Sequence, residues 1–379
     1  MSERRRGIFT QQEKGTVLIV TMWIVLVLVG IVLVLSRSMR VETIAAANHV
    51  SSLQADAIAK GALHFIRARL NNQDEALMID GDTPYEAIPV GDGYFWLLRP
   101  DFEIENDYSF GIRDECTRIN LNTAIYNMLM NIPGMTSEFA ASIIDWRDRN
   151  SSVDSAGGAE DQYYLLLTEP HLCKNADFET VEELLMVKGA TPELLYGEDL
   201  NRNGVLDPNE NDGDESDPQD NQDGNLDRGI IDYVTVYSIG AVAGGRTQGS
   251  GPENAETVQP GLININTAPG EILLCVPILT EDQVEEIIEL REAGASEALL
   301  AFLETLGPYE EYFTFSSYRY STDICSVSGD GRAFKRYQAV FDTQVEDMPV
   351  IYWKDLTHLG WPLDPEIITT LRSGESLEE

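Results

Sequence analysis

The stretch from Thr16 to Ser36 reads TVLIVTMWIVLVLVGIVLVLS and holds no charged residue. At a rise of about 1.5 Å per residue, a helix of these 21 residues spans roughly 30 Å, the thickness of the hydrocarbon core of a membrane. Three arginines and a lysine precede the stretch, and most of the acidic residues follow it. Because basic flanks stay in the cytoplasm, the sequence predicts one membrane-spanning helix with a cytoplasmic N-terminus.

A cleaved secretory signal is the alternative to a retained anchor. Its apolar core would be about 7–15 residues long, which is shorter than this stretch. The nearest run of small residues that a signal peptidase could cut is Ala45–Ala47, and it lies beyond Arg37 and Arg40. The length mismatch therefore favours retention of the helix.

The chain of 379 residues is strongly acidic. It has 64 Asp and Glu against 26 Lys and Arg, so its net charge is −38; residues 1–36 carry +2 and the remainder carries −40. This charge repels phosphate backbones and anionic membrane surfaces, which argues against sequence-independent nucleic-acid binding. With 43% hydrophobic residues, the composition is that of a folded protein, and the length allows two or three domains.

The apolar helix is expected to continue beyond the membrane. The segment from Val41 to Leu70 is rich in alanine and lacks proline. Its apolar residues recur at three- and four-residue steps, which predicts a helix that packs on a sheet along one stripe. The predicted stripe is Leu53, Ala57, Ile58, Gly61, Ala62 and Phe65.

Strand patterns occur near both ends of the remaining chain. Aromatic and β-branched runs separated by turn residues predict strands. The runs cover residues 93–99, 108–114 (the weaker one), 323–328, 333–343 and 349–353. The turn Gly329–Gly331 favours a hairpin because glycine adopts positive φ at little cost. We therefore expect a sheet that begins before residue 115 and resumes after residue 320, with roughly 200 helical residues inserted between.

The insertion contains an internal repeat. Ile119–Ala124 reads INLNTA and Ile263–Ala268 reads ININTA. Each is followed by a short turn, IPGMT ending at Thr136 or VPILT ending at Thr280, and then by a helix. Threonine at these positions caps a helix, so each copy is predicted to be a helix-hairpin-helix unit. Acidic residues follow both hairpins, and no Lys or Arg lies near them, so protein contact is favoured over DNA binding.

An acidic segment between the repeats, Glu198 to Asp232, carries twelve acids and two bases. A solvated linker is the ordinary reading of such a run. Its first part nevertheless has oxygen-bearing residues at the ligand positions of a twelve-residue calcium loop, with a glycine at the sixth position for the sharp turn. The predicted calcium ligands are Asp199, Asn201, Asn203, the carbonyl of Val205, Asp207 and Glu210.

The second part of the acidic segment has suitable ligand types but irregular spacing. Gln219 would fall at the first loop position and Ile230 at the twelfth. It is a candidate for a second ion or for completing the first ligand shell. Its candidate ligands are Asp217, Asp220, Asp223 and Asp227.

No catalytic constellation is present in the sequence. The four histidines are far apart, and no HExxH, GxSxG, Walker or dinucleotide motif occurs, so we expect no enzyme. Four cysteines in an oxidising compartment permit two disulfides with three alternative pairings. These candidates are Cys116, Cys173, Cys275 and Cys325.

The N-terminal junction resembles a type IV prepilin leader. A short basic segment ends in Gly15, and the uncharged helix follows at once. The resemblance implies that a prepilin peptidase cuts after Gly15 and methylates the new N-terminus, Thr16. Pilins carry glutamate at the fifth mature position, where this chain has Val20; the K family of minor pseudopilins is known for lacking it.

Taken with the split sheet, the Asn-Thr-Ala repeats and the terminal strand Val350–Trp353, the chain resembles the general secretion pathway protein K (GspK) family, minor pseudopilins of the type II secretion system. The resemblance implies an α+β, pilin-like fold: a long N-terminal transmembrane helix on a small antiparallel sheet, with a large inserted α-helical domain containing two SAM-like modules and bound calcium. Domains are expected at 1–15 (prepilin leader), 16–36 (transmembrane helix), 37–115 (pilin-like helix and first strands), 116–316 (insertion, with modules at 116–190 and 260–316 and the acidic loop at 198–232), 317–355 (last strands) and 356–379 (tail).

The same resemblance implies a non-catalytic subunit that starts or caps the periplasmic pseudopilus needed for secretion across the outer membrane. Its expected partners are pseudopilins I and J, the major pseudopilin, prepilin peptidase and the inner membrane, with no nucleic acid and no small-molecule substrate. It would be a single-pass inner-membrane protein whose main domain is periplasmic. The alternative is a membrane-anchored DNA-uptake receptor, or a minor subunit of a related type IV pilus; a calcium-dependent hydrolase is a third reading that no nucleophile–base pair supports.

Overall fold

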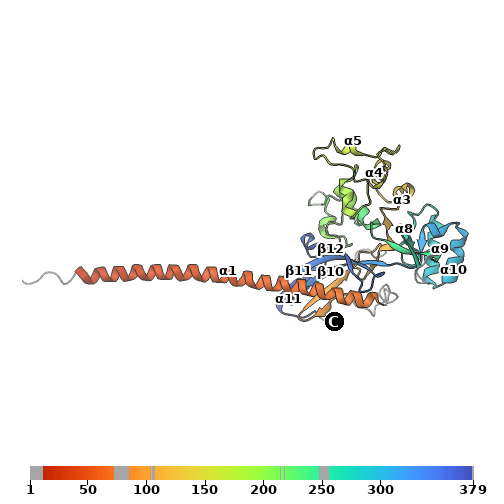
Figure 1. The fold of residues 1–379 in the computed structure, drawn as a ribbon. Coiled ribbons are helices and arrows are strands. Elements are labelled where there is room, and N and C mark those ends of the chain that lie inside the picture. Colours follow the sequence, from red (N-terminus) through yellow and green to blue (C-terminus); the bar gives the residue numbers. More distant parts are fainter. Residues whose placement is uncertain are drawn as a thin grey trace, which may run out of the picture.

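One long helix begins the described part of the chain. The computed structural model describes residues 12–377, except 72–84, 103, 105–106, 214, 217 and 247–255. Helix α1 (Gln12–Leu70, 59 residues) contains both the apolar stretch and the segment after it, as predicted. Figure 1 shows α1 projecting far beyond the rest of the molecule, and its side chains are exposed from Thr16 to Ala46.

The buried face of α1 differs from the predicted stripe. Leu53 and Ala57 are exposed, whereas the residues buried against the sheet are Ala55, Ile58, Ala59, Ala62, Ile66 and Leu70. The predicted stripe mixed two neighbouring rows of the helix surface. The sheet contacts the row that contains Ile58 and Ala62, where small alanines let the helix backbone approach closely.

The main sheet has the strand order β1-β2-β10-β11-β12, and β3 lies beside β10; all neighbours are antiparallel. Its strands are β1 (Ile88–Val90), β2 (Gly93–Leu98), β3 (Arg113–Asp114), β10 (Arg319–Val327), β11 (Phe334–Asp342) and β12 (Val350–Asp355). The four stronger strand predictions are confirmed. The weaker one forms a strand only at its end, and β1 was not predicted because it has only three residues.

Strand β10 joins the two parts of the sheet that the insertion separates. Leu98 of β2 pairs with Asp323, and Asp114 of β3 pairs with Tyr320. The Asp114 carboxylate also accepts a hydrogen bond of 2.7 Å from the hydroxyl of Ser317, just before β10. The two ends of the insertion therefore lie side by side.

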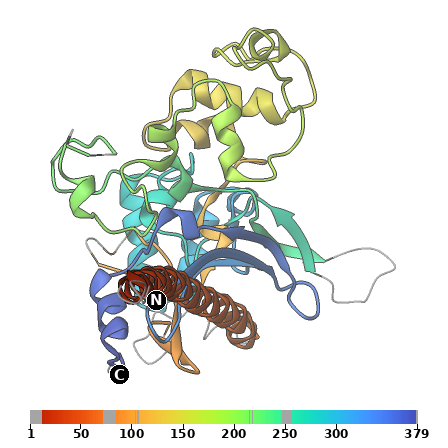
Figure 2. The ribbon, with the colours of Figure 1, turned by 90° about the vertical axis from the view of Figure 1, so that its left-hand side faces the viewer.

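Side chains alternate between the two faces of the sheet, as the strand period requires. Phe95, Leu97 and Ile324 pack against α1, whereas Trp96 and Cys325 face the opposite side. That opposite face is covered by the C-terminal segment, which forms η5 (Thr357–Leu359) and helix α11 (Pro365–Ser373). The sequence predicted a tail at residues 356–379; instead, Leu363 and Leu371 bury apolar surface against the sheet. Figure 2 shows the helix of this segment just before the C-terminus.

The insertion lies between β3 and β10 and contains short strands as well as helices. The helices are η1 (Glu115–Thr117), α3 (Tyr126–Met130), α4 (Ser137–Arg147), α5 (Asp161–Tyr164), η2 (Val181–Met186), α6 (Pro192–Tyr196), η3 (Pro208–Glu210), α7 (Ile230–Tyr233), α8 (Gly270–Leu273), α9 (Glu281–Glu292), α10 (Ser296–Thr305) and η4 (Tyr309–Glu311). The strands are β4 (Ile119–Asn120), β5 (Val234–Thr235), β6 (Ile239–Arg246), β7 (Glu256–Pro260), β8 (Ile263–Asn264) and β9 (Phe313–Thr314).

Two pairs of these short strands join the beginning of each half of the insertion to its end. Strand β4 pairs with β5 in parallel, and β8 pairs with β9 in the same way, while β6 and β7 form an antiparallel hairpin. The expectation of a helical insertion missed β4, β5, β8 and β9 because a two-residue strand leaves no periodicity in the sequence. It missed β6, which reads IGAVAGGR, because small residues and glycines give no strand pattern of alternating large side chains. A single apolar core runs through both halves, from Ile119 to Phe313.

Candidate functional site

The first repeat is a pair of helices joined by a tight turn. Helix α3 ends before Gly134, which adopts a φ of +75°, and the Thr136 hydroxyl caps α4 by accepting from the backbone N–H of Phe139 at 3.2 Å. At the far end of α4, Arg147 donates to the backbone carbonyls of Leu121 and Ala124. The arginine thus connects the end of the second helix to the Asn-Thr-Ala turn.

The second repeat reproduces these contacts. Arg291, at the end of α9, donates to the carbonyls of Ile265 and Ala268. Asn264 accepts from the backbone N–H of Asn266 at 3.1 Å, as Asn120 accepts from Asn122 at 2.9 Å in the first copy. The repeat predicted from sequence is therefore also a repeat of hydrogen bonds.

The two repeats contact each other at equivalent residues. The Asn131 amide donates to the carbonyl of Cys275 at 3.3 Å, and the Cys275 thiol donates to the carbonyl of Asn131 at 3.5 Å. These residues are 144 positions apart, which is also the offset between Ile119 and Ile263. Because each residue contacts its own counterpart, the repeats are related by a local two-fold axis at this point.

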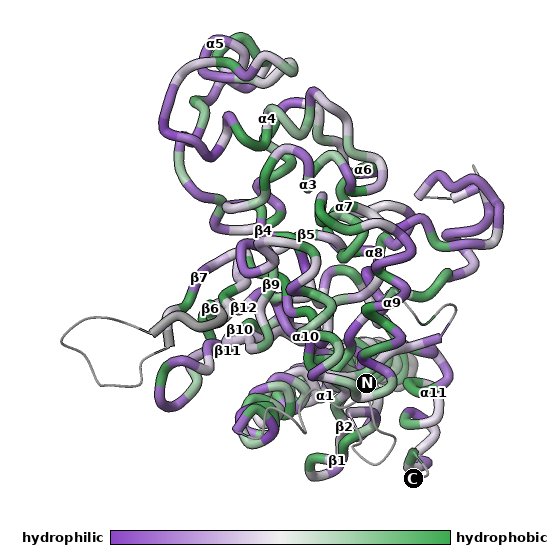
Figure 3. The backbone as a smooth tube through the Cα atoms, turned by 90° about the vertical axis from the view of Figure 1, so that its right-hand side faces the viewer, coloured by the Kyte–Doolittle hydropathy of each residue, from purple (hydrophilic) through white to green (hydrophobic). Residues whose placement is uncertain are grey.

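The first calcium-loop candidate folds as a closed turn. The Asp199 carboxylate accepts from the backbone N–H groups of Asn203 (2.9 Å) and Gly204 (2.8 Å), and Gly204 has a φ of +79°. The Glu210 carboxylate accepts from Leu200 and Asp207, which brings the two ends of the loop together. Figure 3 shows strongly hydrophilic chain beside α7, the helix that follows the acidic segment.

Burial and like charges act on the carboxylates of this loop. Burial, with the negative charge of Asp232, raises the pKa of Asp199 to about 6. Burial, with the charges of Asp199 and Asp207, raises the pKa of Glu210 to about 7. A nearby cation would favour the ionised form of both groups.

The remaining predicted ligands lie in the same loop. The side-chain amides of Asn201 and Asn203 both donate to Asp207 Oδ2. Among the residues that the structure describes, no group of three or more His, Cys, Asp or Glu side chains is arranged to hold a metal ion. The oxygen-bearing residues of the loop are of the type that binds calcium, because a calcium loop takes many of its ligands from amide and backbone oxygens.

The second acidic stretch repeats the first at an offset of 20 residues (Asn201 and Asn221). Asn221 donates to Asp227 at 3.0 Å, as Asn201 donates to Asp207. Arg202 and Gln222 have φ values of +58° and +55°. Of the predicted ligands, Asp220, Asp223 and Asp227 lie in this turn, and Asp217 lies outside the described residues.

Sequence reasoning missed Glu198, which joins the second stretch. Its carboxylate accepts from the backbone N–H groups of Asn221 (3.3 Å) and Asp227 (3.2 Å), as Glu210 does in the first loop. Burial raises its pKa, with the negative charges of Asp227 and Asp220 adding to the effect. The shared pattern N-x-[ND]-G-x-L-D was the available signal, but a glutamate 23 residues before Asn221 is found only in the fold.

Comparison with known proteins places part of this architecture in a family. Residues 117–196 match the family model described as Type II secretion system (T2SS), protein K. We call this matched segment the protein K domain. It contains the first helix-hairpin-helix repeat and ends at α6, just before the first acidic loop.

A chain in the crystal structure of the GspK-GspI-GspJ complex from the enterotoxigenic Escherichia coli type 2 secretion system resembles this chain at 12% sequence identity. The similarity has a TM-score of 0.45 and covers 83% of this chain and 99% of that chain. None of the curated proteins matches the chain.

The four cysteines do not pair with one another. Cys173 lies inside the protein K domain, and the other three lie outside it. All four lie in the described part of the chain and are buried free thiols, so none of the disulfides that the sequence permits is formed. Cys116 lies next to the sheet and Cys325 faces α11, whereas Cys173 and Cys275 lie in the core of the insertion. Burial raises the pKa of Cys173, Cys275 and Cys325 to about 12, which makes these thiols poor nucleophiles.

The acidic loop that follows the protein K domain is anchored to the sheet by Arg336 of β11. This fully buried guanidinium donates to Asp323 Oδ2 at 2.7 Å and to the carbonyls of Asn201 and Arg202. The Asn203 amide also donates to the carbonyl of Pro362, in the segment before α11, at 3.0 Å. The loop therefore contacts both the central sheet and the C-terminal segment.

The helix that precedes the protein K domain is long and apolar enough to cross a membrane. Among the described residues, the helical segment Thr16–Leu70 is a candidate membrane span, and its most apolar part is not buried in the protein. This is compatible with a single-pass anchor in a secretion-system component. Gly15 and Thr16, the predicted processing residues, lie in α1, and residues 1–11 of the predicted leader lie outside the described residues.

Proposed function

We propose that this chain is the K minor pseudopilin of a type II secretion system, a non-catalytic subunit at the tip of the periplasmic pseudopilus. The observation that carries the proposal is the protein K match at residues 117–196, located inside an insertion in a sheet that packs on the outer half of α1. A long helix packed on a small sheet is an arrangement suited to a subunit that assembles into a pseudopilus. The insertion holds the segment that matches protein K.

The exposed half of α1 first holds the subunit in the inner membrane and then packs into the pseudopilus. Prepilin peptidase cuts after Gly15 and methylates Thr16, and the N-terminus is cytoplasmic because the basic residues precede the span. In the bilayer the helix satisfies its own backbone hydrogen bonds, so no partner is required there. Val20 stands where pilins carry a glutamate. A carboxylate at this position would neutralise a charge on the subunit above, so its absence suits a subunit that has no subunit above it.

The size of the insertion supports a position at the tip. Figure 1 shows the insertion extending to one side of the sheet, at the end of the molecule opposite the exposed part of α1. Such a broad head would obstruct the addition of a further subunit above it. Pseudopilins I and J, with the major pseudopilin below, are the proposed partners.

Deletion of the gene is expected to abolish secretion by this system, and the full chain supplied in trans is expected to restore it. The measurement is the amount of secreted protein in the medium, with co-purification of pseudopilins I and J through a tag on the C-terminus. If deletion left secretion intact but abolished DNA uptake or surface piliation, the related-pilus alternative would hold and this proposal would fail.

We also propose that calcium binds the acidic segment. Asp199, Asn201, Asn203, the Val205 carbonyl, Asp207 and Glu210 would hold one ion, and the stretch with Asp220, Asp223 and Asp227 would hold a second with help from Glu198. Buried acids without a neighbouring cation are costly, so an ion would stabilise the loop by offsetting their repulsion. The residues themselves orient the backbone: Gly204 supplies the turn, and Arg336 holds the loop on the sheet.

Removal of calcium with EDTA is expected to lower the melting temperature of the full chain in detergent. At a calcium concentration one hundred times Kd, binding contributes about 2.7 kcal/mol to the free energy of unfolding. Asp199→Asn and Glu210→Gln should each reduce the difference in melting temperature between the calcium-loaded and EDTA-treated chain. Glu215→Gln, at an exposed position, should leave that difference unchanged. A melting temperature that is the same with calcium and with EDTA would contradict the calcium proposal but leave the secretion proposal standing.

A further inference from the structure

Glu160, the residue before helix α5, is a buried acid without a partner. Only 3% of its surface is exposed, and neither oxygen of its carboxylate has a hydrogen-bond partner among the described residues. Its side chain does not cap α5 either. A buried charge that is neither paired nor hydrogen-bonded is costly, so this carboxylate requires a partner that the described part of the chain does not supply.

A second buried acid, Asp145, lies beside Glu160 near the end of α4. Asp145 is 1% exposed, and both of its carboxylate oxygens accept from the backbone N–H of Asp154, at 3.2 and 3.1 Å. A Cβ atom at Gly158 would overlap Asp145 Oδ2, so this carboxylate lies against the backbone two residues before Glu160. An ionised carboxylate has about four lone pairs, so Asp145 can accept further bonds. Figure 1 shows α4 and α5 together at the outer end of the insertion.

Acidic neighbours act on both of these residues. Burial, followed by the charges of Asp145 and Asp148, raises the pKa of Glu160. Burial also raises the pKa of Asp145, and the charges of Asp148 and Asp154 add to this effect. Two buried carboxylates with two further acids around them repel one another, and this repulsion favours a cation between them.

The basic residues that are nearest in the sequence have other surroundings. Arg147 donates to two backbone carbonyls of the first repeat, and Arg149 is exposed. Lys174 and Lys188 form ion pairs with other glutamates, outside this pair of acids. None of these four residues therefore balances the two buried carboxylates by an ion pair.

The Cys173 thiol, a neutral group next to Glu160, has its hydrogen committed elsewhere. It donates to the carbonyl of Asp145 at 3.5 Å, while the backbone N–H of Cys173 donates to Asp161 at 2.8 Å. A thiol has one hydrogen, so none remains for Glu160. A proton on Glu160 would likewise find no acceptor, because neither of its oxygens has a hydrogen-bond partner in the described part of the chain.

We propose that Glu160 and Asp145 bind a divalent cation that prefers oxygen ligands, Ca²⁺ or Mg²⁺. The two carboxylates would supply the charged ligands, and backbone carbonyls and water would complete the shell, as is usual for these ions. A cation uses both oxygens of Glu160 and offsets the repulsion between the acids. The site lies in the protein K domain, apart from the acidic segment at 198–232, so it depends neither on calcium in that segment nor on the role in secretion.

The experiment is a calorimetric titration of the full chain in detergent, stripped of metal with EDTA and dialysed, with CaCl₂ and separately with MgCl₂. Glu160→Gln keeps the shape of the side chain and removes its charge. We expect this variant to bind one ion fewer than the unaltered chain, or to bind that ion about tenfold more weakly. Glu169→Gln, at an exposed position of the same segment, is the matched control and should bind as the unaltered chain does.

An ion lost from the CaCl₂ titration would assign calcium to the site, and an ion lost from the MgCl₂ titration would assign magnesium. Equal binding by Glu160→Gln and by the unaltered chain in both titrations would overturn the proposal. Equal weakening by Glu169→Gln would show non-specific attraction to acidic residues and would overturn it as well.

The melting temperature gives a second test, in which the direction of the change decides. In EDTA, Glu160→Gln is expected to raise the melting temperature, because it removes a buried unpaired charge. At saturating Ca²⁺ or Mg²⁺ it is expected to lower the melting temperature, because a ligand is lost. A rise in both conditions would rule out a bound cation. The same reversal is expected in an Asp199→Asn background, and its absence there would assign the ion to the acidic segment and overturn the proposal.

Discussion

Replacing Gly15 by valine is expected to leave the leader on the chain and to abolish secretion. Prepilin peptidase must bring the backbone before the cut close to its own catalytic groups, and glycine is the residue that permits such an approach. Cells with active peptidase should therefore accumulate only the longer form. Gel mobility in a pulse–chase experiment and mass analysis of the N-terminus measure the processed fraction.

The matched control is Gly30→Val, in the same helix. A Cβ atom at Gly30 would meet no heavy atom within 4 Å, so this variant should be processed normally. Complete processing of Gly15→Val would contradict the leader assignment. It would leave the membrane anchor intact and favour a plain single-span protein.

Replacing Arg336 by methionine is expected to cost about 3–5 kcal/mol of unfolding free energy. The guanidinium is fully buried, and its loss leaves Asp323 and two loop carbonyls without their donor. Because Arg336 connects β11 to the acidic loop, the loop should become more mobile as well. Urea unfolding of the full chain in detergent measures the stability, and hydrogen exchange at residues 199–210 measures the loop.

A control and a rescue separate this effect from a general loss of charge. Arg332→Met removes an arginine that is 51% exposed in an ion pair with Asp330, which should cost about 0–1 kcal/mol. Adding Asp323→Asn to Arg336→Met should recover part of the loss, because it removes the unpaired buried carboxylate. Equal losses for Arg332→Met and Arg336→Met would show that the buried contacts contribute little.

Local patterns predicted most of the architecture. The long helix, the four stronger strands and the two repeats follow from apolar runs, alternation and capping residues that lie close together in the chain. Helix α11 was missed although Asp364 caps it and Pro365 opens it, which was a readable helix start. The buried face of α1 was misplaced because periodicity alone does not say which of two neighbouring rows meets the sheet.

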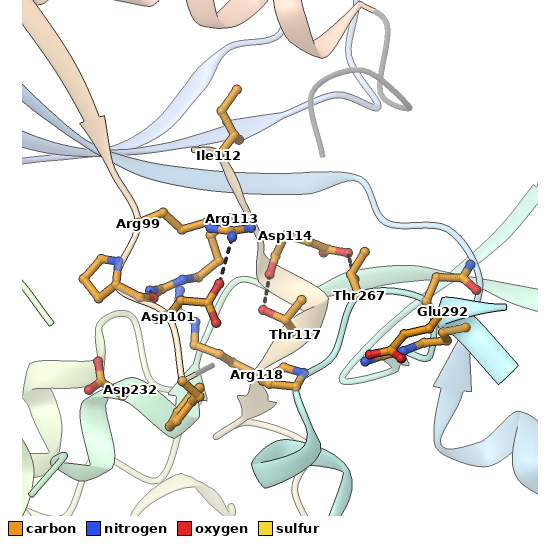
Figure 4. A pocket seen from close by; sticks show the side chains of 15 residues that line it. Arg99, Asp101, Ile112, Arg113, Asp114, Thr117, Arg118, Asp232, Thr267 and Glu292 are labelled. Atoms are coloured by element: carbon orange, nitrogen blue, oxygen red, sulfur yellow. Dashed lines mark hydrogen bonds and ion pairs between the residues drawn. The ribbon is translucent and has the colours of Figure 1, made fainter. Parts of the chain in front are cut away.

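The features that depend on distant residues could not be predicted. Glu198 accepts hydrogen bonds from the second acidic stretch although it lies outside the register of that stretch, and Arg336 reaches the first loop from a strand more than a hundred residues away. A cavity where the sheet meets the insertion, lined by Arg113 and Arg291 among other residues, combines segments from both ends of the insertion (Figure 4). Each needs the tertiary fold to bring its parts together.

The side-by-side ends of the insertion have a consequence for the order of folding. Leu98 must pair with Asp323, a closure over more than two hundred residues that costs roughly 5 kcal/mol of chain entropy if the intervening segment is unstructured. A folded insertion removes most of that cost, because the hydrogen bond between Asp114 and Ser317 already holds its two ends together. The sheet should therefore form last, on the slower timescale typical of non-local contacts, once the insertion has acted as a preformed bridge between its halves.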